Sequence, residues 1–220
     1  VVSVPPRFTK DAVFEALENG IQLIVVVTEN IPRREVAQMV ELANLRGARI
    51  IGPNCLGMIS PEEAKMGGVG GPAANTRQAY AKGHIGVMSR SGGMTTEIAS
   101  TLTAAGLGQS TCVSIGGDAI IGTTYAELMP LFEADPETHA IAIYSEPGGR
   151  MEAELAEWIQ ANNSRLPVVA FMAGRFMDEM KGMRFGHHDG KIKRMEAAGI
   201  SVAERIEEIP ALLRKRLEEV

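Results

Sequence analysis

The order of hydrophobic and polar positions along the chain predicts helices and strands in alternation. Between residues 33 and 46, apolar side chains recur at positions i, i+3, i+4 and i+7, the spacing of an amphipathic helix: Val36, Met39, Val40 and Ala43. A continuous apolar run over 21–28 predicts a buried strand before that helix, and a shorter run over 48–51 predicts a strand after it. With a further helix predicted over 11–19, this order is typical of a parallel sheet.

The same alternation begins again at about residue 83 and continues to the end of the chain. Strands are predicted over 85–89, 111–115, 140–144 and 168–171, helices over 94–105, 124–133 and 151–161, and a helix–strand–helix segment over 191–219. Between the two series, residues 60–82 contain several prolines and glycines with little periodicity. We therefore expect residues 60–82 to form an irregular connection between two lobes.

The expected fold class is α/β, with two doubly wound parallel-sheet lobes. Residues 1–76 are predicted to form a truncated Rossmann-like lobe, and residues 77–220 a flavodoxin-like lobe. A Rossmann-like lobe normally opens with a strand and a glycine-rich turn, and this sequence opens with neither. We expect that strand and its glycine-rich loop to precede Val1.

Composition and charge narrow the class of partner. The 220 residues are 45% hydrophobic and 22% charged, as in ordinary globular proteins. A formal net charge of -5 without a dense Lys/Arg run argues against nucleic acid and against an anionic membrane surface. The two cysteines have no paired-ligand spacing, so a disulfide framework and a metal site within the chain are not expected. We expect a small ligand and a cytoplasmic location, or the mitochondrial matrix in a eukaryote.

Glycine-rich turns follow four of the predicted strands, over residues 89–93, 115–118, 146–149 and 173–174. If these strands lie in one parallel sheet, the turns meet at its carboxyl edge, where ligands bind in open α/β sheets. Turns that open onto helix N-termini also present unpaired N–H groups to an anion. Downstream lies His187, for which the pattern indicates no structural role. The arrangement raises the hypothesis of a histidine that carries phosphate.

Several short motifs also follow one another in a recognisable order. They are Gly52-Pro53-Asn54-Cys55, Ser89-Arg90-Ser91-Gly92, Ile115-Gly116-Gly117-Asp118, Glu146 with Gly148-Gly149, and Gly186-His187. Together they resemble the α subunit of succinyl-CoA synthetase, the related CoA ligases and the corresponding part of ATP-citrate lyase. The resemblance covers nearly the whole chain. It implies an acid–CoA ligase in which a histidine carries phosphate between two sites, with the first lobe binding CoA.

The resemblance assigns roles to particular residues. His187 would carry the phosphate, and Glu146 would contact its ring and orient it, as the acidic member of a catalytic triad does. The phosphate would be bound at the turns that follow the strands, by Ser89, Ser91, Gly92, Gly93, Gly116 and Gly117. CoA would be bound by residues of the first lobe, namely Pro5, Thr28, Glu29, Asn54 and Cys55, the last near the thiol end. Glu146 could instead be an acidic residue that favours the start of a helix, and Cys55 a small buried apolar residue.

One departure from the family concerns the segment after His187. The family loop continues for roughly a dozen residues beyond the glycine and histidine, whereas here the family pattern resumes at Lys191. Two explanations are open: the loop is shortened, or residues are missing from the sequence between His187 and His188. We favour the second explanation, because catalytic loops are mobile and residues 191–195 resume the family pattern without strain. The catalytic role is therefore assigned to His187 alone.

Three functions are compatible with these observations. The first is the α subunit of an acid–CoA ligase that forms succinyl-CoA or a related acyl-CoA. The second keeps the phosphohistidine but uses citrate or malate, as in citryl-CoA synthetase, ATP-citrate lyase or malate–CoA ligase, and Ser91-Gly92-Gly93-Met94 looks closer to the citrate enzymes. The third is a non-catalytic CoA-binding module.

Partners follow from the resemblance and from what the sequence lacks. No Walker loop, kinase signature or grasp-type nucleotide site is found in the sequence. The resemblance implies that ATP or GTP, with Mg²⁺, is bound by a β subunit with a grasp domain, in an αβ or (αβ)₂ assembly. The remaining partner is a small dicarboxylic or tricarboxylic acid.

Overall fold

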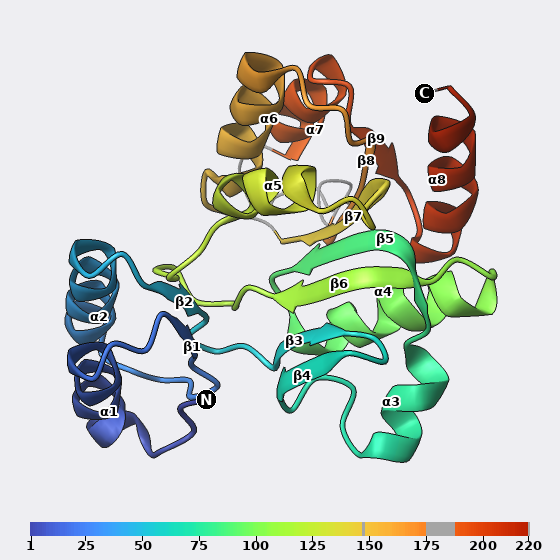
Figure 1. The fold of residues 1–220 in the computed structure, drawn as a ribbon. Coiled ribbons are helices and arrows are strands. Elements are labelled where there is room, and N and C mark those ends of the chain that lie inside the picture. Colours follow the sequence, from blue (N-terminus) through green and yellow to red (C-terminus); the bar gives the residue numbers. More distant parts are fainter. Residues whose placement is uncertain (147, 175–187, 220) are drawn as a thin grey trace.

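The computed structural model describes residues 1–146, 148–174 and 188–219 (Figure 1). Its α-helices are α1 (Pro6–Glu18), α2 (Arg33–Leu45), α3 (Ala73–Ala79), α4 (Gly92–Ala104), α5 (Tyr125–Ala134), α6 (Met151–Asn162), α7 (His188–Ala197) and α8 (Ile209–Glu218). Its strands are β1 (Leu23–Val25), β2 (Arg49–Ile51), β3 (Gly57–Ser60), β4 (Ala64–Gly67), β5 (Lys82–Ser89), β6 (Gln109–Ser114), β7 (Ala140–Ser145), β8 (Val168–Met172) and β9 (Ser201–Ala203). Among these described helices, none is long and apolar enough to cross a membrane.

The larger lobe is built on a seven-stranded sheet with the order β4-β3-β6-β5-β7-β8-β9. Strands β6, β5, β7, β8 and β9 are parallel, whereas β3 runs antiparallel to β6 and β4 antiparallel to β3. Counted from β5, the parallel strands have the order 2-1-3-4-5, which is the flavodoxin-like order. The doubly wound α/β fold expected from the sequence is confirmed.

Helices cover both faces of this sheet (Figure 1). Ile98 of α4 and Leu213 of α8 are buried in the core of one face. Leu155 of α6 and Met195 of α7 are buried in the core of the other face, together with Tyr125 of α5. The strands between the two cores are apolar on both sides, and all six residues of β7 are buried. This explains why β7 appears in the sequence as a continuous apolar run instead of an alternating one.

The smaller lobe contains β1 and β2, which pair in parallel, and Val2, which bridges to Val26 beside them. Helices α1 and α2 pack on this small sheet and bury Val13 and Met39 against it. Helix α1 begins earlier than predicted, at Pro6, because proline at the first helical position has a φ angle suited to the helix and needs no hydrogen-bond donor there.

The prediction of an irregular connection over residues 60–82 is wrong. This region contains the end of β3, all of β4 and all of α3, and it ends at the start of β5. Both strands belong to the seven-stranded sheet. The pattern failed here because each strand has four residues and β4 is exposed or half-buried, so neither shows a clear apolar period. The predicted domain boundary after residue 76 stays a prediction.

The segment that follows β6 joins the two lobes. The N–H of Gly117 donates to the carbonyl of Asn54 at 3.1 Å, and the N–H of Gly122 donates to the carbonyl of Gly52 at 2.8 Å. Gly116 allows this approach: its φ is +106°, and a Cβ at this position would lie 2.1 Å from the carbonyl oxygen of Pro53. Only glycine fits such a backbone without displacing the neighbouring chain.

We expect Gly116→Ala to lower the free energy of unfolding by about 2 kcal/mol or more, because it adds a backbone clash to an unfavourable φ. The measurement is urea denaturation followed by circular dichroism. Gly190→Ala is the matched control: Gly190 lies in α7, is exposed and has no heavy atom near its ideal Cβ, so alanine should stabilise by about 0.5–1 kcal/mol. Equal midpoints for the two variants would contradict the steric explanation.

Candidate functional site

The carboxyl ends of the parallel strands carry the candidate site. Strand β5 pairs with β6 on one side and with β7 on the other, so the connections after β5 and β7 leave the sheet in opposite directions. Such a switch point opens a crevice in which α/β proteins bind ligands. Two cavities lie at this edge, and residues of the segment 117–121 line the second of them.

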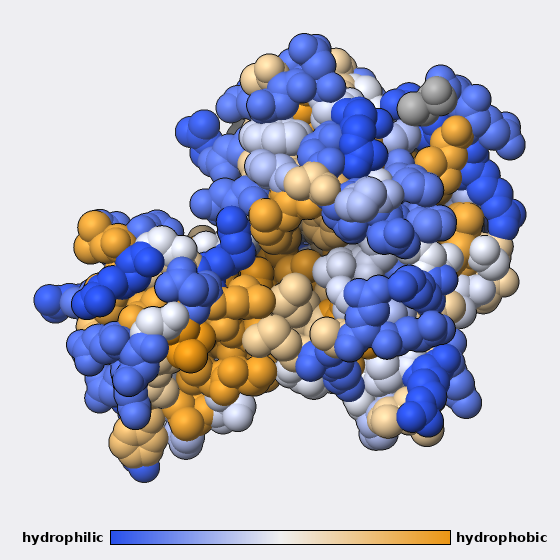
Figure 2. All heavy atoms as spheres, in the orientation of Figure 1, coloured by the Kyte–Doolittle hydropathy of each residue, from blue (hydrophilic) through white to orange (hydrophobic). Residues whose placement is uncertain are grey.

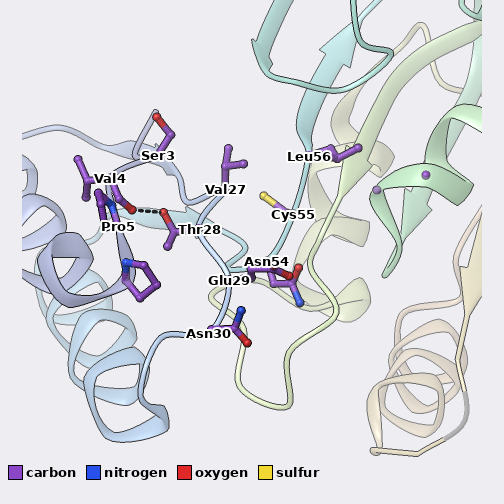
Figure 3. Close-up of a pocket in the computed structure, with 13 residues that line it drawn as sticks. Ser3, Val4, Pro5, Val27, Thr28, Glu29, Asn30, Asn54, Cys55 and Leu56 are labelled. Atoms are coloured by element: carbon purple, nitrogen blue, oxygen red, sulfur yellow. Dashed lines mark hydrogen bonds between the residues drawn. The ribbon is translucent and has the colours of Figure 1, made fainter.

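The first cavity has a volume of about 770 Å³ and lies between the smaller lobe and the start of α4 (Figure 3). Figure 2 shows apolar residues gathered in the hollow between the two lobes. The structure brings all the predicted CoA residues into the lining of this cavity, together with two of the predicted phosphate-binding glycines: Pro5, Thr28, Glu29, Asn54, Cys55, Gly92 and Gly93. These residues come from four separate parts of the sequence, and only the fold makes them neighbours.

Hydrogen bonds fix the walls of the first cavity. The hydroxyl of Thr28 donates to the carbonyl of Val4 at 2.7 Å and joins the segment after β1 to the start of the chain (Figure 3). The side-chain amide of Asn54 donates to Asp118 Oδ1 at 2.9 Å. Asn54 has a φ of +54°, a left-handed conformation that asparagine tolerates better than most residues. Asp118, like Gly117, thus contributes to a contact between the lobes.

Cys55 lies in the wall of the first cavity as a neutral thiol. Its side chain is buried, and its Sγ donates to the carbonyl of Val26 at 3.3 Å. Burial raises the pKa of the Cys55 thiol to about 11, and a hydrogen bond from the backbone of Gly57 only partly opposes that shift. Because the thiolate is the reactive form, Cys55 is a packing residue and not a nucleophile at neutral pH.

Serines shape the turn that leads into α4. Ser91 is the N-cap residue, and its hydroxyl accepts from the N–H of Met94 at 3.5 Å. Ser89 is buried, and its hydroxyl donates to the carbonyl of Ser91 at 2.7 Å and accepts from the N–H of Ser91 at 3.1 Å. Ser89 therefore holds the turn. Gly92 and Gly93 begin the helix, and the structure shows no partner for their N–H groups among the residues that it describes.

The second cavity has a volume of about 660 Å³ and lies at the ends of β5 and β7, beside α6. Glu146 follows β7 directly, is half-buried and lines this cavity, as do Gly117 and Arg90. Gly116 lines neither cavity, and its backbone lies against the carbonyl of Pro53. The predicted site residues that line a cavity are therefore divided between two neighbouring cavities and do not form a single site.

The structure contains a buried ion pair beside the second cavity that the sequence analysis did not predict. Lys191 Nζ lies 3.0 Å from Glu152 Oε2, and the side chains are only 14% and 1% exposed. Ser145 Oγ donates to Glu152 Oε1 at 2.6 Å, and Lys191 also donates to the carbonyl of Gly148. The pair thus joins α7 to the turn after Glu146. Nothing in the local sequence distinguishes these two residues from ordinary surface charges, because they are far apart along the chain.

His187 lies outside the residues that the structure describes. The described chain stops at Gly174, after β8, and starts again with α7 at His188. Strand β8 pairs with β7, so this interruption falls at the same edge of the sheet as Glu146. The role of His187 stays a prediction. In the parts of the chain that the structure describes, no group of three or more His, Cys, Asp or Glu residues could hold a metal ion.

Comparisons with known proteins identify the family. An α/β protein of two lobes, with cavities at the carboxyl edge of its sheet, belongs to a large class that binds small molecules. The family model described as CoA-ligase matches residues 88–212. The chain belongs to the CoA-ligase family.

Relatives of known name match over most of their length. The chain is 44% identical to the ADP-forming sulfoacetate-CoA ligase subunit SauD of Bilophila wadsworthia, over 97% of this chain and 75% of that protein. It is 41% identical to a succinate–CoA ligase [ADP-forming] α subunit of Archaeoglobus fulgidus, again over 97% of this chain and 75% of that protein. The first alignment extends over 225 residues, more than the 220 of this chain, so the relative has residues in the matched region that are absent here.

A solved structure with the same fold is the ATP citrate lyase of Methanosaeta concilii in complex with (3S)-citryl-CoA. The TM-score is 0.89 at 24% sequence identity, and the match covers 98% of this chain. This chain spans only 38% of the length of that lyase chain. At this level of identity the match shows the shared fold.

We expect Lys191→Met to lower the free energy of unfolding by about 3 kcal/mol or more, because it leaves the Glu152 carboxylate buried without its cation. The measurement is urea denaturation. The control is Lys82→Met, which removes a shorter ion pair, 2.7 Å from Glu63, whose side chains are 47% and 58% exposed. Its effect should stay within about 1 kcal/mol. A loss for Lys82→Met equal to that for Lys191→Met would contradict burial as the cause.

We expect Cys55 in the folded protein to react with iodoacetamide at pH 8 about two orders of magnitude more slowly than in the unfolded chain, because a pKa of about 11 leaves little thiolate. The measurement is the rate of alkylation at Cys55, read by peptide mass spectrometry. Raising the pH toward 11 should accelerate the reaction as long as the fold persists. The same chain in urea is the control, and equal rates in both states would contradict a protonated, buried thiol.

Proposed function

We propose that the chain is the α subunit of an ADP-forming acid–CoA ligase that acts through a phosphohistidine at His187. One observation carries the proposal: the N-terminus of α4 opens into the same cavity as the residues predicted to bind CoA. A cavity with this lining can hold the thiol end of CoA close to a bound anion. Membership of the CoA-ligase family supports CoA as the cofactor.

The start of α4 supports the phosphate-binding role. Gly92 and Gly93 provide N–H groups at the positive end of the helix dipole, which stabilises an anion by roughly 0.3–2 kcal/mol. Gly93 is exposed and has open space where a side chain would stand, so a phosphoryl group can approach the backbone there. Ser89 and Ser91 would contribute indirectly by holding the turn.

The proposed reaction has three transfers. The ring nitrogen of His187 attacks the γ-phosphorus of the nucleoside triphosphate, and the diphosphate leaves. A carboxylate oxygen of the acid then attacks the phosphorus of the phosphohistidine, and the histidine leaves as neutral imidazole. Finally, the CoA sulfur attacks the carbonyl carbon of the acyl phosphate, the thiol proton is lost, and inorganic phosphate leaves with the bonding electrons.

Glu146 would orient the histidine ring. It lies at the end of β7, next to the strand after which the segment with His187 begins. A carboxylate that accepts a hydrogen bond from one ring nitrogen leaves the other unprotonated and therefore nucleophilic. The buried pair of Glu152 and Lys191 would hold the turn after Glu146 in place, through the carbonyl of Gly148.

The acid is proposed to be small and to carry a second anionic group. The relatives are named for succinate, with two carboxylates, and for sulfoacetate, with a carboxylate and a sulfonate. Succinate is the acid expected from the motifs, and sulfoacetate now stands beside it because of the 44% identical subunit. A citrate or malate ligase is less well supported, since the structural likeness to ATP citrate lyase extends to the fold alone.

We propose that a partner subunit binds the nucleotide and Mg²⁺ and brings them to this chain. The relatives are named as subunits of ADP-forming ligases, which supports a second, nucleotide-binding subunit and ATP as the phosphate donor. A grasp-domain β subunit in an αβ or (αβ)₂ assembly is the arrangement that we propose. A non-catalytic CoA-binding module is the alternative if no phosphate transfer occurs.

We expect the chain, incubated with its nucleotide-binding partner, Mg²⁺ and γ-labelled ATP, to acquire an acid-labile label at His187. His187→Asn should abolish the label, whereas His188→Asn, a change at the neighbouring histidine, should retain it. CoA with either succinate or sulfoacetate should discharge the label and give the acyl-CoA, which names the acid. Label retained in His187→Asn would reject the phosphohistidine, and absence of label in every variant would favour the CoA-binding module.

A further inference from the structure

Arg90 is a buried cation at the switch point of the sheet. It follows β5 directly, is only 7% exposed and lines the second cavity. Its Nη2 donates to the carbonyls of Gly117 and Asp118, each at 2.8 Å. Its Nε is buried and has no hydrogen-bond partner within the described residues. The other terminal nitrogen, Nη1, lies 3.8 Å from the position that a Cβ on Gly149 would occupy, on the wall of the same cavity.

No acidic residue that the structure describes forms an ion pair with Arg90. Two backbone carbonyls offset only part of the cost of burying a guanidinium, because a buried charge normally requires an opposite charge. The other charged residues that line the cavity are Arg150, Glu154 and Glu146. Arg150 Nε lies 3.9 Å from Glu154 Oε1, so these two charges offset each other. Arg90 and Glu146 are the remaining charged residues of the lining, and neither has an ion pair among the described residues.

The start of α6 adds a second feature that favours an anion. The helix has twelve residues and begins at Met151, next to the glycines that line the cavity. Its N-cap residue, Arg150, provides no side-chain cap, so the first N–H groups of the helix lack that partner. Glu152, in the first turn, turns instead toward Ser145 and Lys191. The helix dipole and Arg90 therefore act in the same direction on a ligand in the second cavity.

We propose that the second cavity is an oxyanion site in which Arg90 binds a carboxylate, sulfonate or phosphoryl group of the reactants. The inference rests on the proposed function for the identity of those reactants, and on the geometry alone for the binding of an anion. An incoming oxyanion accepts a hydrogen bond from Nη1, the terminal nitrogen beside Gly149 on the cavity wall, and supplies a negative charge. Charge-assisted bonds of this kind are among the strongest that a guanidinium makes.

The test is a titration of the full chain, labelled with ¹⁵N-arginine, in which the Nε–H resonance of Arg90 is followed by NMR. The resonance is assigned by its loss in Arg90→Lys. Succinate, sulfoacetate and inorganic phosphate are added separately, with sodium chloride at equal ionic strength as the reference. At least one oxyanion should move the resonance to saturation. Arg90→Gln has no such resonance, so its affinity is measured by isothermal titration calorimetry beside the unchanged chain, and it should bind that anion about tenfold or more weakly, the loss expected when a charge-assisted bond is removed.

The matched control is Arg165→Gln. Arg165 also donates to backbone carbonyls, those of Glu133, Asp135 and Thr138, but it lies outside the lining of the second cavity. It also pairs with Glu133 Oε2 at 3.2 Å, so Arg165→Gln reports the effect of removing a structural arginine away from the cavity. If Arg90→Gln does not fold, Arg90→Lys replaces it, because lysine keeps the charge and lacks the planar fork. Saturation by succinate or sulfoacetate assigns the cavity to the acid, and saturation by phosphate alone assigns it to the phosphoryl group.

Two results would overturn the inference. One is an Arg90 resonance that none of the three anions moves further than chloride does. The other is equal affinity in Arg90→Gln and Arg165→Gln, which would make Arg90 a purely structural residue. The titration uses neither ATP nor the partner subunit nor His187. A chain that binds an oxyanion at Arg90 but forms no phosphohistidine would therefore keep this inference and reject the proposed function.

Discussion

The structure depends on a close backbone contact between the segment after β6 and the segment after β2. Gly116 and Gly122 meet Pro53 and Ile50 at distances that leave no room for a side chain. Hydrogen bonds close the contact, including one from the hydroxyl of Thr123 to the carbonyl of Ile50 at 2.6 Å. Because main-chain atoms form most of this contact, its geometry has little freedom to adjust. It places the smaller lobe against the carboxyl edge of the larger sheet, and the first cavity lies between the two.

Two buried charged residues, Glu152 and Arg90, lie at this edge, and they differ in the partners that offset their charges. Glu152 is 1% exposed and has Lys191 and Ser145 as partners. Its role is to hold the turn after Glu146, and a complete set of partners suits a residue that stays in one position. Arg90 is nearly as buried, yet its hydrogen bonds among the described residues go only to carbonyls. In physical terms, a buried pair holds its two elements together because losing either partner leaves an uncompensated charge, whereas an incompletely paired charge can gain its partner from a ligand.

In the turn between β5 and α4, some residues hold the backbone in place and others present donors to a ligand, although the sequence motif assigned phosphate binding to all of them. Ser89 and Ser91 use their hydroxyls on the turn itself, and Gly92 and Gly93 present backbone donors to the first cavity. Arg90, between the two serines, points to the second cavity. One short stretch of chain thereby serves both cavities, since neighbouring residues at a strand end face opposite sides of the sheet. A ligand in either cavity would contact residues only one or two positions apart.

The sequence determined the elements of this protein. Apolar periods located the helices and most strands, because burial in one core imposes a regular spacing, and the ordered motifs pointed to the CoA-ligase family. The short strands β3 and β4 escaped detection because four residues are too few to show a period. Tertiary structure alone decided that Asn54 lies against Asp118, that Lys191 neutralises Glu152, and that the Nε of Arg90 is buried without a hydrogen-bond partner among the described residues. These contacts join residues far apart along the chain, and local spacing carries no information about which distant charges meet or which remain alone.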